Sequence, residues 1–388
     1  MSAPRRLLTI GHSYCVRRNR ELGEALAALG RTGADRWEVT VAAPVSFPGD
    51  LGPIVTKRDT TERAELRLLP VRAARHIHVM TYGRGLHELL EEPWDVVHCW
   101  EEPYVLSAAQ IARLHRVRSA LVYASFQNIA KRYPPPFGAI ERYAMHRARG
   151  WIAFGQSVND VLERRRGYAE RPHAIIPFGV NLTRFAPDRA AREAMLAELG
   201  WADAGPPIVG FVGRFVREKG LPLLLGALDE LARRGTPWRA LFVGGGALEP
   251  EVRGFAARYA GRVHVATAVA HDEVPRYMRV IDVLAAPSET TPAWREQFGR
   301  MIVEAFACGV PVVGSDSGEI PYVVGTAGLV VAERDSGAWV AALASLLTDE
   351  RARADLGMRG RTRAESEFAW PVVAARHMDF FQGLLTSP

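Results

Sequence analysis

The chain alternates short apolar runs with amphipathic segments almost throughout its length. In the segments between the runs, apolar residues recur at three- and four-residue spacing, which is typical of helices packed on one face. Parallel strands need a connection of helical size, so this alternation predicts parallel sheets covered by helices. In the first half, the predicted strands are Leu7–Gly11, Trp37–Ala42, Val97–Trp100, Ser119–Ala124, Gly150–Ala153 and Ala174–Ile176, and the predicted helices are Arg20–Leu29 and Val105–Leu114.

A second series of the same kind follows the segment Pro177–Asn181, whose composition suits a turn between domains. The series repeats the alternation without a tandem repeat of short period. Its predicted strands are Ile208–Val212, Trp238–Gly244, Val263–Thr267, Val283–Ala286, Pro311–Ser315 and Gly328–Val331. Its predicted helices are Gly220–Arg234, Glu249–Tyr259, Val274–Val280, Arg300–Cys308 and Ser336–Leu347.

The length of 388 residues exceeds what one hydrophobic core usually supports, which indicates two domains. We therefore expect an α/β protein of two facing, Rossmann-like, doubly wound parallel-sheet domains with a cleft between them. The expected N-terminal domain is residues 1–178, joined by a C-terminal helix in residues 370–388 that packs back onto it. The expected C-terminal domain is residues 179–369.

The apolar content of 48% is that of an ordinary globular protein, and no apolar run approaches the roughly 20 residues that span a bilayer. The segment Met1–Ile10 fits a first strand better than a signal peptide. The three cysteines, Cys15, Cys99 and Cys308, are widely separated and form no CxxC or Cys/His cluster. They suggest reduced thiols in a cytoplasmic protein.

The two halves of the chain differ in charge. Residues 1–180 carry a formal charge of +8, and the remainder carries −2. A basic N-terminal half suits an anionic acceptor or a membrane surface, although a generally arginine-rich composition explains it more simply. The basic residues are not arranged in a recognisable nucleic-acid-binding motif, so we do not expect nucleic acid as a partner.

The first group of residues that could bind or act on a ligand is the segment Gly210–Gly220. The strand ends at Gly213, and Arg214 and Lys219 then stand five residues apart in a loop before a helix. Such a loop can place a guanidinium and an ammonium on a diphosphate leaving group, whose negative charge grows during glycosyl transfer. The alternative is a solvated basic loop in which Glu218 pairs with a neighbouring cation.

The second group is the segment Glu296–Pro311, in which a polar turn leads into an apolar helix. Unpaired N–H groups at the start of that helix can receive phosphate or sugar oxygens. Glu304 lies one turn into the helix, where it can accept hydrogen bonds from ribose hydroxyls, and Glu296 precedes the turn and can reach a sugar. The alternative, an amphipathic helix with exposed glutamates, does not explain the polar turn.

Two further segments are weaker signals. The turn Gly314–Pro321 follows a predicted strand and suits either the same site or a purely structural role. The run Gly244–Gly246 can admit a nucleotide closely. The segment has no GxGxxG fingerprint, which argues against a dinucleotide-dependent oxidoreductase.

Taken together, these residues resemble the retaining glycosyltransferases of family 4, which have the two-domain GT-B fold. The family's Gly-Arg-…-Glu-Lys-Gly loop is matched within Gly213–Gly220, and its paired glutamates are matched by Glu296 and Glu304. The pattern that follows the second glutamate is matched within Ala305–Pro311. The segment Ile176–Asn181 resembles the family's interdomain connection, and Val283–Ser288 resembles the strand that enters the glutamate loop.

The resemblance implies a role for each matched position. Arg214 and Lys219 would neutralise the donor diphosphate, Glu304 would hold the ribose, and Glu296 would hold the donor sugar and act with the two cations in catalysis. The enzyme would work without a metal or other cofactor and would retain the anomeric configuration. The implied donor-binding residues are Gly213, Thr267, Val269, Gln297, Phe298, Gly299, Arg300, Met301 and Glu304.

The N-terminal half departs from the family pattern. The segment after the first strand is Gly11-His12-Ser13-Tyr14 instead of a Gly-Gly loop, and Gln127 stands where a histidine is common. We therefore treat His12, His98 and Gln127 as acceptor-side candidates, with a structural role as the alternative for both histidines. The stretch Glu289–Arg295 lengthens the loop before Glu296, so the family's sugar preference does not transfer.

These features predict a transferase that moves a sugar from a nucleotide sugar to a glycan, lipid-linked or small-molecule acceptor. The basic, aromatic stretch Lys131–Phe137 and the helix after it favour a solvated helix face, with peripheral contact with a membrane as the alternative. The alternatives are a sugar-nucleotide epimerase of the same architecture and a non-catalytic nucleotide-sugar-binding subunit.

Overall fold

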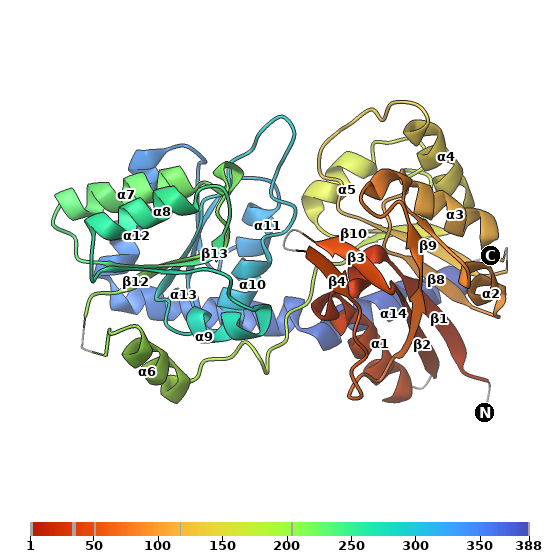
Figure 1. Ribbon diagram of the computed structural model, residues 1–388, viewed down its shortest axis with the longest axis horizontal. Coiled ribbons are helices and arrows are strands. Elements are labelled where there is room, and N and C mark those ends of the chain that lie inside the picture. Colours follow the sequence, from red (N-terminus) through yellow and green to blue (C-terminus); the bar gives the residue numbers. More distant parts are fainter. Residues whose placement is uncertain (1–2, 33–35, 50–51, 117, 203–204, 387–388) are drawn as a thin grey trace. The chain divides into compact units, whose positions relative to one another are not determined.

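The computed structural model describes residues 3–32, 36–49, 52–116, 118–202 and 205–386 (Figure 1). The chain forms two compact units. The first combines Met1–Pro177 with Trp370–Pro388, and the second is Phe178–Ala369. The sequence-based division had placed the boundary one residue later, after residue 178.

The first unit is built on a parallel sheet of seven strands in the order β11-β10-β9-β8-β1-β2-β5. Every neighbouring pair in this sheet is parallel. The chain enters at β1 and builds outward first to one side and then to the other, as in doubly wound folds. The strands are β1 (Arg5–Ile10), β2 (Trp37–Pro44), β5 (Glu65–Leu69), β8 (Val96–Cys99), β9 (Ala120–Ser125), β10 (Gly150–Ala153) and β11 (His173–Ile175).

Helices cover both faces of this sheet. The C-terminal helix α14 lies beside α1, and the indole Nε1 of Trp370 donates a 2.6 Å hydrogen bond to Glu21 (Figure 1). The helices are α1 (Glu21–Thr32), α2 (Leu86–Glu91), α3 (Leu106–Leu114), α4 (Phe137–Arg147), α5 (Gln156–Leu162) and α14 (Trp370–Thr386), with the short 3-10 turns η1 (His12–Cys15), η2 (Arg17–Arg20) and η3 (Ile77–Val79).

Two histidines are buried between β8 and α14. His98 and His377 are fully buried, with ring centroids 5.4 Å apart. Burial holds the pKa of His98 well below its ordinary value, with a further contribution from His377. Burial also lowers the pKa of His377 to about 4, although a hydrogen bond to the Val373 carbonyl opposes this. Both imidazoles are therefore neutral in the folded unit at neutral pH.

This burial predicts that acid weakens the first unit. An unfolded histidine takes up a proton as the pH falls below about 6.5, whereas His377 in the folded chain stays neutral down to about 4. We expect His377 to lower the free energy of unfolding by about 2 kcal/mol between pH 8 and pH 5. Urea unfolding at both pH values should show that the free energy of unfolding differs less between pH 8 and pH 5 in His377→Leu than in the wild type. An equal difference in both proteins would contradict the assignment.

The second unit contains a parallel sheet of six strands in the order β14-β13-β12-β15-β16-β17. Its main core gathers buried side chains from β12, β13 and the helices α7, α8 and α12. The strands are β12 (Ile208–Arg214), β13 (Arg239–Gly245), β14 (Val263–Ala266), β15 (Val283–Ala286), β16 (Val312–Ser315) and β17 (Leu329–Val331). The helices are α6 (Arg189–Glu198), α7 (Leu221–Arg233), α8 (Glu249–Arg258), α9 (Val274–Met278), α10 (Arg300–Ala307), α11 (Ile320–Val324), α12 (Ser336–Thr348) and α13 (Glu350–Arg363), with the turn η4 (Arg217–Lys219).

The prediction of two parallel-sheet α/β domains is confirmed. The sequence analysis missed β5, whose five residues pair only at the edge of the first sheet, and α13, which is rich in arginine and poor in apolar residues. It also missed two antiparallel hairpins. Their strands are β3 (Ser46–Gly49) with β4 (Gly52–Val55), and β6 (Val71–Arg72) with β7 (Thr81–Tyr82).

Candidate active site

The strand order of the second unit reverses between β12 and β15. β13 and β14 lie on one side of β12, and β16 and β17 lie beyond β15. Open parallel sheets bind ligands at the carboxyl ends of the two strands that flank such a reversal. The loop that starts at Arg214 leaves β12 at this point, and the residues 287–299 leave β15 beside it.

The cationic loop is held in place by the glycine run that follows β13. A Cβ atom on Gly244 would lie 1.8 Å from the carbonyl oxygen of Gly213, and Gly244 has a φ of +149°. The amide of Phe215 donates to the Gly245 carbonyl at 2.8 Å. The run Gly244–Gly246 thus serves close backbone packing, which the sequence analysis had considered only as close approach of a nucleotide.

Lys219 and Glu296 form an ion pair where the two loops meet. Lys219 Nζ lies 2.5 Å from Glu296 Oε2, and the two side chains are only 14% and 8% exposed. The same carboxylate oxygen accepts a 2.8 Å hydrogen bond from Ser288 Oγ. The ring of Trp294 lies 5.0 Å from the Lys219 ammonium, within the range of a cation–π interaction. The structure thus brings together two of the three residues predicted to be catalytic.

Arg214, the third of them, is more open. Its side chain is 58% exposed and lies 3.9 Å from Glu218. A salt bridge this exposed contributes little to stability, so the guanidinium can turn to another anion at small cost. The solvated-loop alternative holds for Arg214 but not for Lys219, which is nearly buried.

The helix α10 begins directly after the glutamate loop, at Arg300. Glu304 is buried on this helix, Gln297 is exposed, and Met301 is partly exposed. Phe298 is buried and packs edge-on against Phe178 at 5.5 Å. The Arg300 guanidinium lies 3.7 Å from the centre of the same Phe178 ring.

We therefore assign Phe298 a packing role in this loop. The proposed contacts of the other loop residues with a donor stay predictions.

The turn after β16 packs against the backbone of Glu296. The amide of Glu319 donates a 3.0 Å hydrogen bond to the Glu296 carbonyl. A Cβ atom on Gly318, which has a φ of +57°, would lie 2.1 Å from that carbonyl oxygen. Ser315 Oγ donates to the Ser288 carbonyl at 2.5 Å. This third segment therefore packs against the backbone of the glutamate loop, which fits both the site interpretation and the structural one.

The lengthened loop before Glu296 has a defined fold. Thr291 and Trp294 form an antiparallel bridge. The Thr290 amide donates to the Glu333 carboxylate, and Arg334 donates a 2.7 Å hydrogen bond to the Thr290 carbonyl. These anchors hold Trp294 in position over Lys219.

Two of the residues that the family resemblance implies for donor binding lie farther along the sheet edge. Thr267 and Val269 follow β14, which is separated from β12 by β13. Thr267 Oγ1 accepts a 3.1 Å hydrogen bond from Arg253. Both residues stand at the carboxyl edge, but the structure does not bring them against the Lys219–Glu296 pair.

The first unit has a reversal of its own, between β1 and β8. His12 follows β1, and its Nδ1 lies 2.7 Å from Glu101 Oε2. Glu101 is fully buried and also accepts hydrogen bonds from the His12 amide and the Tyr82 hydroxyl, at 2.7 and 2.6 Å. Glu101 raises the pKa of His12 against the opposing effect of burial, which by itself lowers it.

Glu101 was missed by the sequence analysis, because only the fold brings it beside His12. Its position directly after β8, at the strand reversal, is the signal that could have identified it.

The other two acceptor-side candidates differ from His12. His98 is fully buried in the core against α14, on a central strand that is buried on both faces, which favours the structural alternative for this residue. Gln127 follows β9 and donates a 2.5 Å hydrogen bond to the Ile129 carbonyl. Nearby, burial raises the pKa of Glu102 to about 7, although hydrogen bonds from Ser125 and Phe126 oppose this rise.

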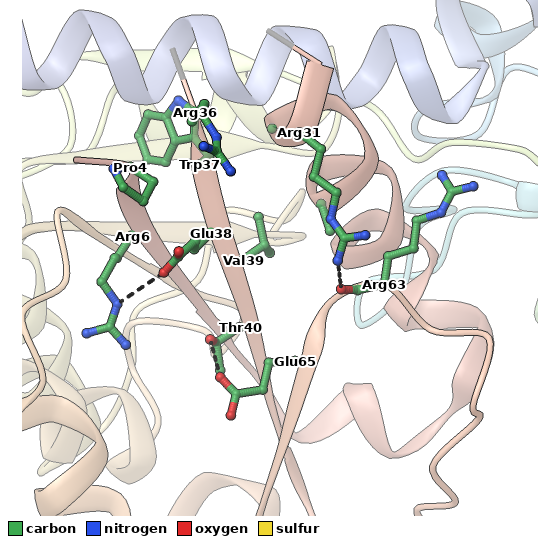
Figure 2. A pocket seen from close by; sticks show the side chains of 12 residues that line it. Pro4, Arg6, Arg31, Arg36, Trp37, Glu38, Val39, Thr40, Arg63 and Glu65 are labelled. Carbon is green, nitrogen blue, oxygen red and sulfur yellow. Dashed lines mark hydrogen bonds and ion pairs between the residues drawn. The ribbon is translucent and has the colours of Figure 1, made fainter. Parts of the chain in front are cut away.

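A pocket of about 330 Å³ lies at the opposite edge of the first sheet, where β1, β2 and β5 begin (Figure 2). Several of its polar groups are already engaged with one another. Thr40 donates to Glu65 at 3.2 Å, and Arg31 donates to the Arg63 carbonyl at 3.0 Å. Ligands of doubly wound sheets bind at the carboxyl edge, so we do not place the site in this pocket.

Within the described ranges, no three His, Cys, Asp or Glu side chains gather in a way that could hold a metal ion. Among the helices that the structure describes, none is both long and apolar enough to cross a membrane.

The two doubly wound sheets, with a cationic loop and a glutamate loop meeting at the second strand reversal, define the class of GT-B glycosyltransferase folds. Comparison with known families agrees with this class. The family model described as "Glycosyltransferase Family 4" matches residues 16–184, and the one described as "Glycosyl transferases group 1" matches residues 206–349. The chain belongs to the family 4, or group 1, glycosyltransferases.

Individual proteins are similar over parts or all of the chain. A GDP-mannose-dependent alpha-(1-6)-phosphatidylinositol monomannoside mannosyltransferase of Mycolicibacterium smegmatis is 36% identical over 214 residues, which are 54% of this chain and 56% of that protein. A D-inositol 3-phosphate glycosyltransferase of Nocardia farcinica is 34% identical over 223 residues, 54% of this chain and 47% of that protein. The chain thus spans about half the length of the curated relatives it matches.

Among solved structures, sucrose-phosphate synthase from Thermosynechococcus elongatus has a TM-score of 0.74 at 22% identity, over 99% of this chain and 100% of that one. This likeness shows that the two proteins share a fold.

Proposed function

We propose that the protein is a glycosyltransferase that moves a sugar from a nucleotide-sugar donor to a hydroxyl-bearing acceptor. The observation that carries the proposal is the meeting of the Arg214–Lys219 loop with the Glu296 loop at the strand reversal of the second unit. Such an edge combines cations for a diphosphate with a carboxylate for sugar hydroxyls. Membership of the glycosyltransferase family supports the same chemistry.

In this proposal, Arg214 and Lys219 stabilise the negative charge that grows on the departing nucleotide phosphates. The positive end of the helix dipole at the start of α10 adds to that stabilisation, and Glu304 binds the ribose. Charge neutralisation by protein groups makes a metal unnecessary, so we propose transfer without a metal or other cofactor. We also propose that the anomeric configuration is retained, as in the family that the motifs resemble.

We propose GDP-mannose as the first donor to test, because relatives of 34–36% identity carry it in their names. A ligand that binds only the folded state stabilises it by about 2.7 kcal/mol when its concentration is 100 times Kd. For a unit of the size of Phe178–Ala369 the melting temperature should rise by roughly 5 °C or more. A thermal-shift screen with GDP-mannose, UDP-glucose and ADP-glucose measures this.

The absence of any shift with all three donors would contradict the proposed donor site. Donor turnover that depends on an added acceptor would separate transfer from epimerisation, which needs none.

For the acceptor we propose a hydroxyl-rich glycan, lipid-linked or small molecule, in line with the inositol-containing acceptors named for the relatives. We also propose peripheral membrane contact through Lys131, Arg132 and the start of α4. Lys131 and Arg132 are exposed, and the neighbouring Tyr133 stacks on Tyr104 at 4.1 Å. Co-sedimentation with anionic liposomes at low salt, lost at high salt, would support the contact. The absence of binding at either salt concentration would remove it.

A further inference from the structure

The Lys219–Glu296 ion pair affects which ligands the site binds. We propose that Glu296, by neutralising Lys219, lowers the affinity of the site for a nucleoside diphosphate that carries no sugar, so that the site favours donor over spent nucleotide. The inference rests on the proposed function, because it assigns the diphosphate to Lys219 and the sugar to Glu296.

The electrostatic argument starts from the geometry of the pair. The ammonium and the carboxylate are 2.5 Å apart, and both side chains are nearly buried. The ring of Trp294 lies 5.0 Å from the ammonium, and the low exposure of both charged side chains limits the water that could screen them. A diphosphate that approaches Lys219 therefore meets a pair with no net charge, and it also meets a carboxylate that repels it.

A sugar on the diphosphate changes this balance. Lys219 has three N–H donors and can contact a phosphate while it keeps Glu296 as a partner. As Lys219 turns toward the phosphate, the hydrogen bond that it donates to Glu296 Oε2 weakens, while the hydrogen bond from Ser288 Oγ to the same oxygen stays in place. The hydroxyls of a donor sugar can replace the weakened hydrogen bond, whereas a bare nucleotide has only its ribose hydroxyls, which the proposed function assigns to Glu304.

The same argument applies after transfer. Once the sugar has moved to the acceptor, its hydroxyls leave Glu296, and the carboxylate again competes with the diphosphate for Lys219. We infer that Glu296 thereby speeds the release of the spent nucleotide as well as holding the sugar. Glu296 is then a specificity-determining residue in addition to a sugar-binding one.

The test is calorimetric binding of GDP, UDP, GDP-mannose and UDP-glucose to the full-length protein. Glu296→Gln keeps the shape of the side chain but removes its charge. We expect Glu296→Gln to bind the bare nucleotide of the preferred base about 10-fold more tightly than the wild type, while the nucleotide sugar gains nothing or weakens. The ratio of the two affinities is measured on folded protein only, so it remains informative if the variant is partly unfolded.

Two controls assign the effect to the pair. Glu289→Gln removes a carboxylate from the same loop, but Glu289 pairs with Arg334 at 3.4 Å, so bare-nucleotide affinity should change less than about twofold. In a Lys219→Met background, Glu296→Gln should bring no gain in affinity, since the ammonium that it would release is absent.

Several results would overturn the inference. They are unchanged or weaker nucleotide binding by Glu296→Gln, an equal gain in Glu289→Gln, and a gain that persists without Lys219. If the wild type binds neither nucleotide nor nucleotide sugar, the proposed function fails and the inference fails with it. If the wild type binds both and the ratio does not change, only the inference fails.

Discussion

Replacing Arg214 or Lys219 with alanine is expected to lower sugar transfer about 100-fold, because each cation would stabilise charge that develops on the leaving diphosphate. The effect should appear mainly in kcat, since this charge is greatest in the transition state. Steady-state kinetics with the donor identified by thermal shift would measure it. Arg217→Ala is the matched control, because Arg217 is an exposed cation of the same loop. It should keep the rate within about twofold.

The two variants differ in their expected effect on stability. Lys219→Ala leaves the nearly buried carboxylate of Glu296 without its cation, and breaking a buried pair in this way costs about 3–5 kcal/mol. Arg214→Ala removes only an exposed side chain and should melt like the wild type. Loss of transfer in Arg214→Ala can therefore be assigned to catalysis, because this variant is expected to stay as stable as the wild type. Near wild-type rates in both variants would refute the assigned roles.

Replacing Gly244 with alanine is expected to destabilise the second unit by about 3 kcal/mol and to abolish donor binding. The added Cβ atom would lie 1.8 Å from the Gly213 carbonyl oxygen, so the strand end that carries Arg214 would have to move. Gly244 also has a φ of +149°, which alanine adopts only with strain. Urea unfolding and a donor-induced thermal shift would measure the two effects.

Gly226→Ala is the matched control for this substitution. Gly226 lies within α7, and an added Cβ atom there would meet no atom within 4 Å. Alanine favours a helix over glycine by about 1 kcal/mol, so this variant should be unchanged or more stable. A Gly244→Ala protein that unfolds and binds donor like the wild type would show that the loop tolerates the displacement.

The sequence predicted the sheets well because their central strands are continuous apolar runs. Ile208–Val212 and Val283–Ala286 were identified as strands in this way, and the structure extends β12 by two residues to include Gly213 and Arg214. The edge strand β5 was not identified, because its alternation of polar and apolar residues is short and gives little signal. Buried central strands are therefore easier to predict than edges.

The sequence predicted which segments form the site, but it did not predict the contacts between their side chains. The motifs indicated Lys219 and Glu296 separately, and only the adjacency of β12 and β15 shows that they pair. Glu101 had no local signal, because its partner His12 is 89 residues away. The sequence left two interpretations open for His98, because a histidine in an apolar strand gives no sign of how deeply that strand is buried.

The return of the chain to the first unit through α14 constrains the order in which the protein can mature on the ribosome. Residues 178–369 form their own sheet and core, and they leave the exit tunnel before the helix that completes the first unit. The first unit lacks the helix that packs against α1, and the partner of Glu21, until Trp370–Thr386 has left the exit tunnel. Folding during translation should therefore complete the middle of the chain before its beginning, the reverse of the order in which residues are made.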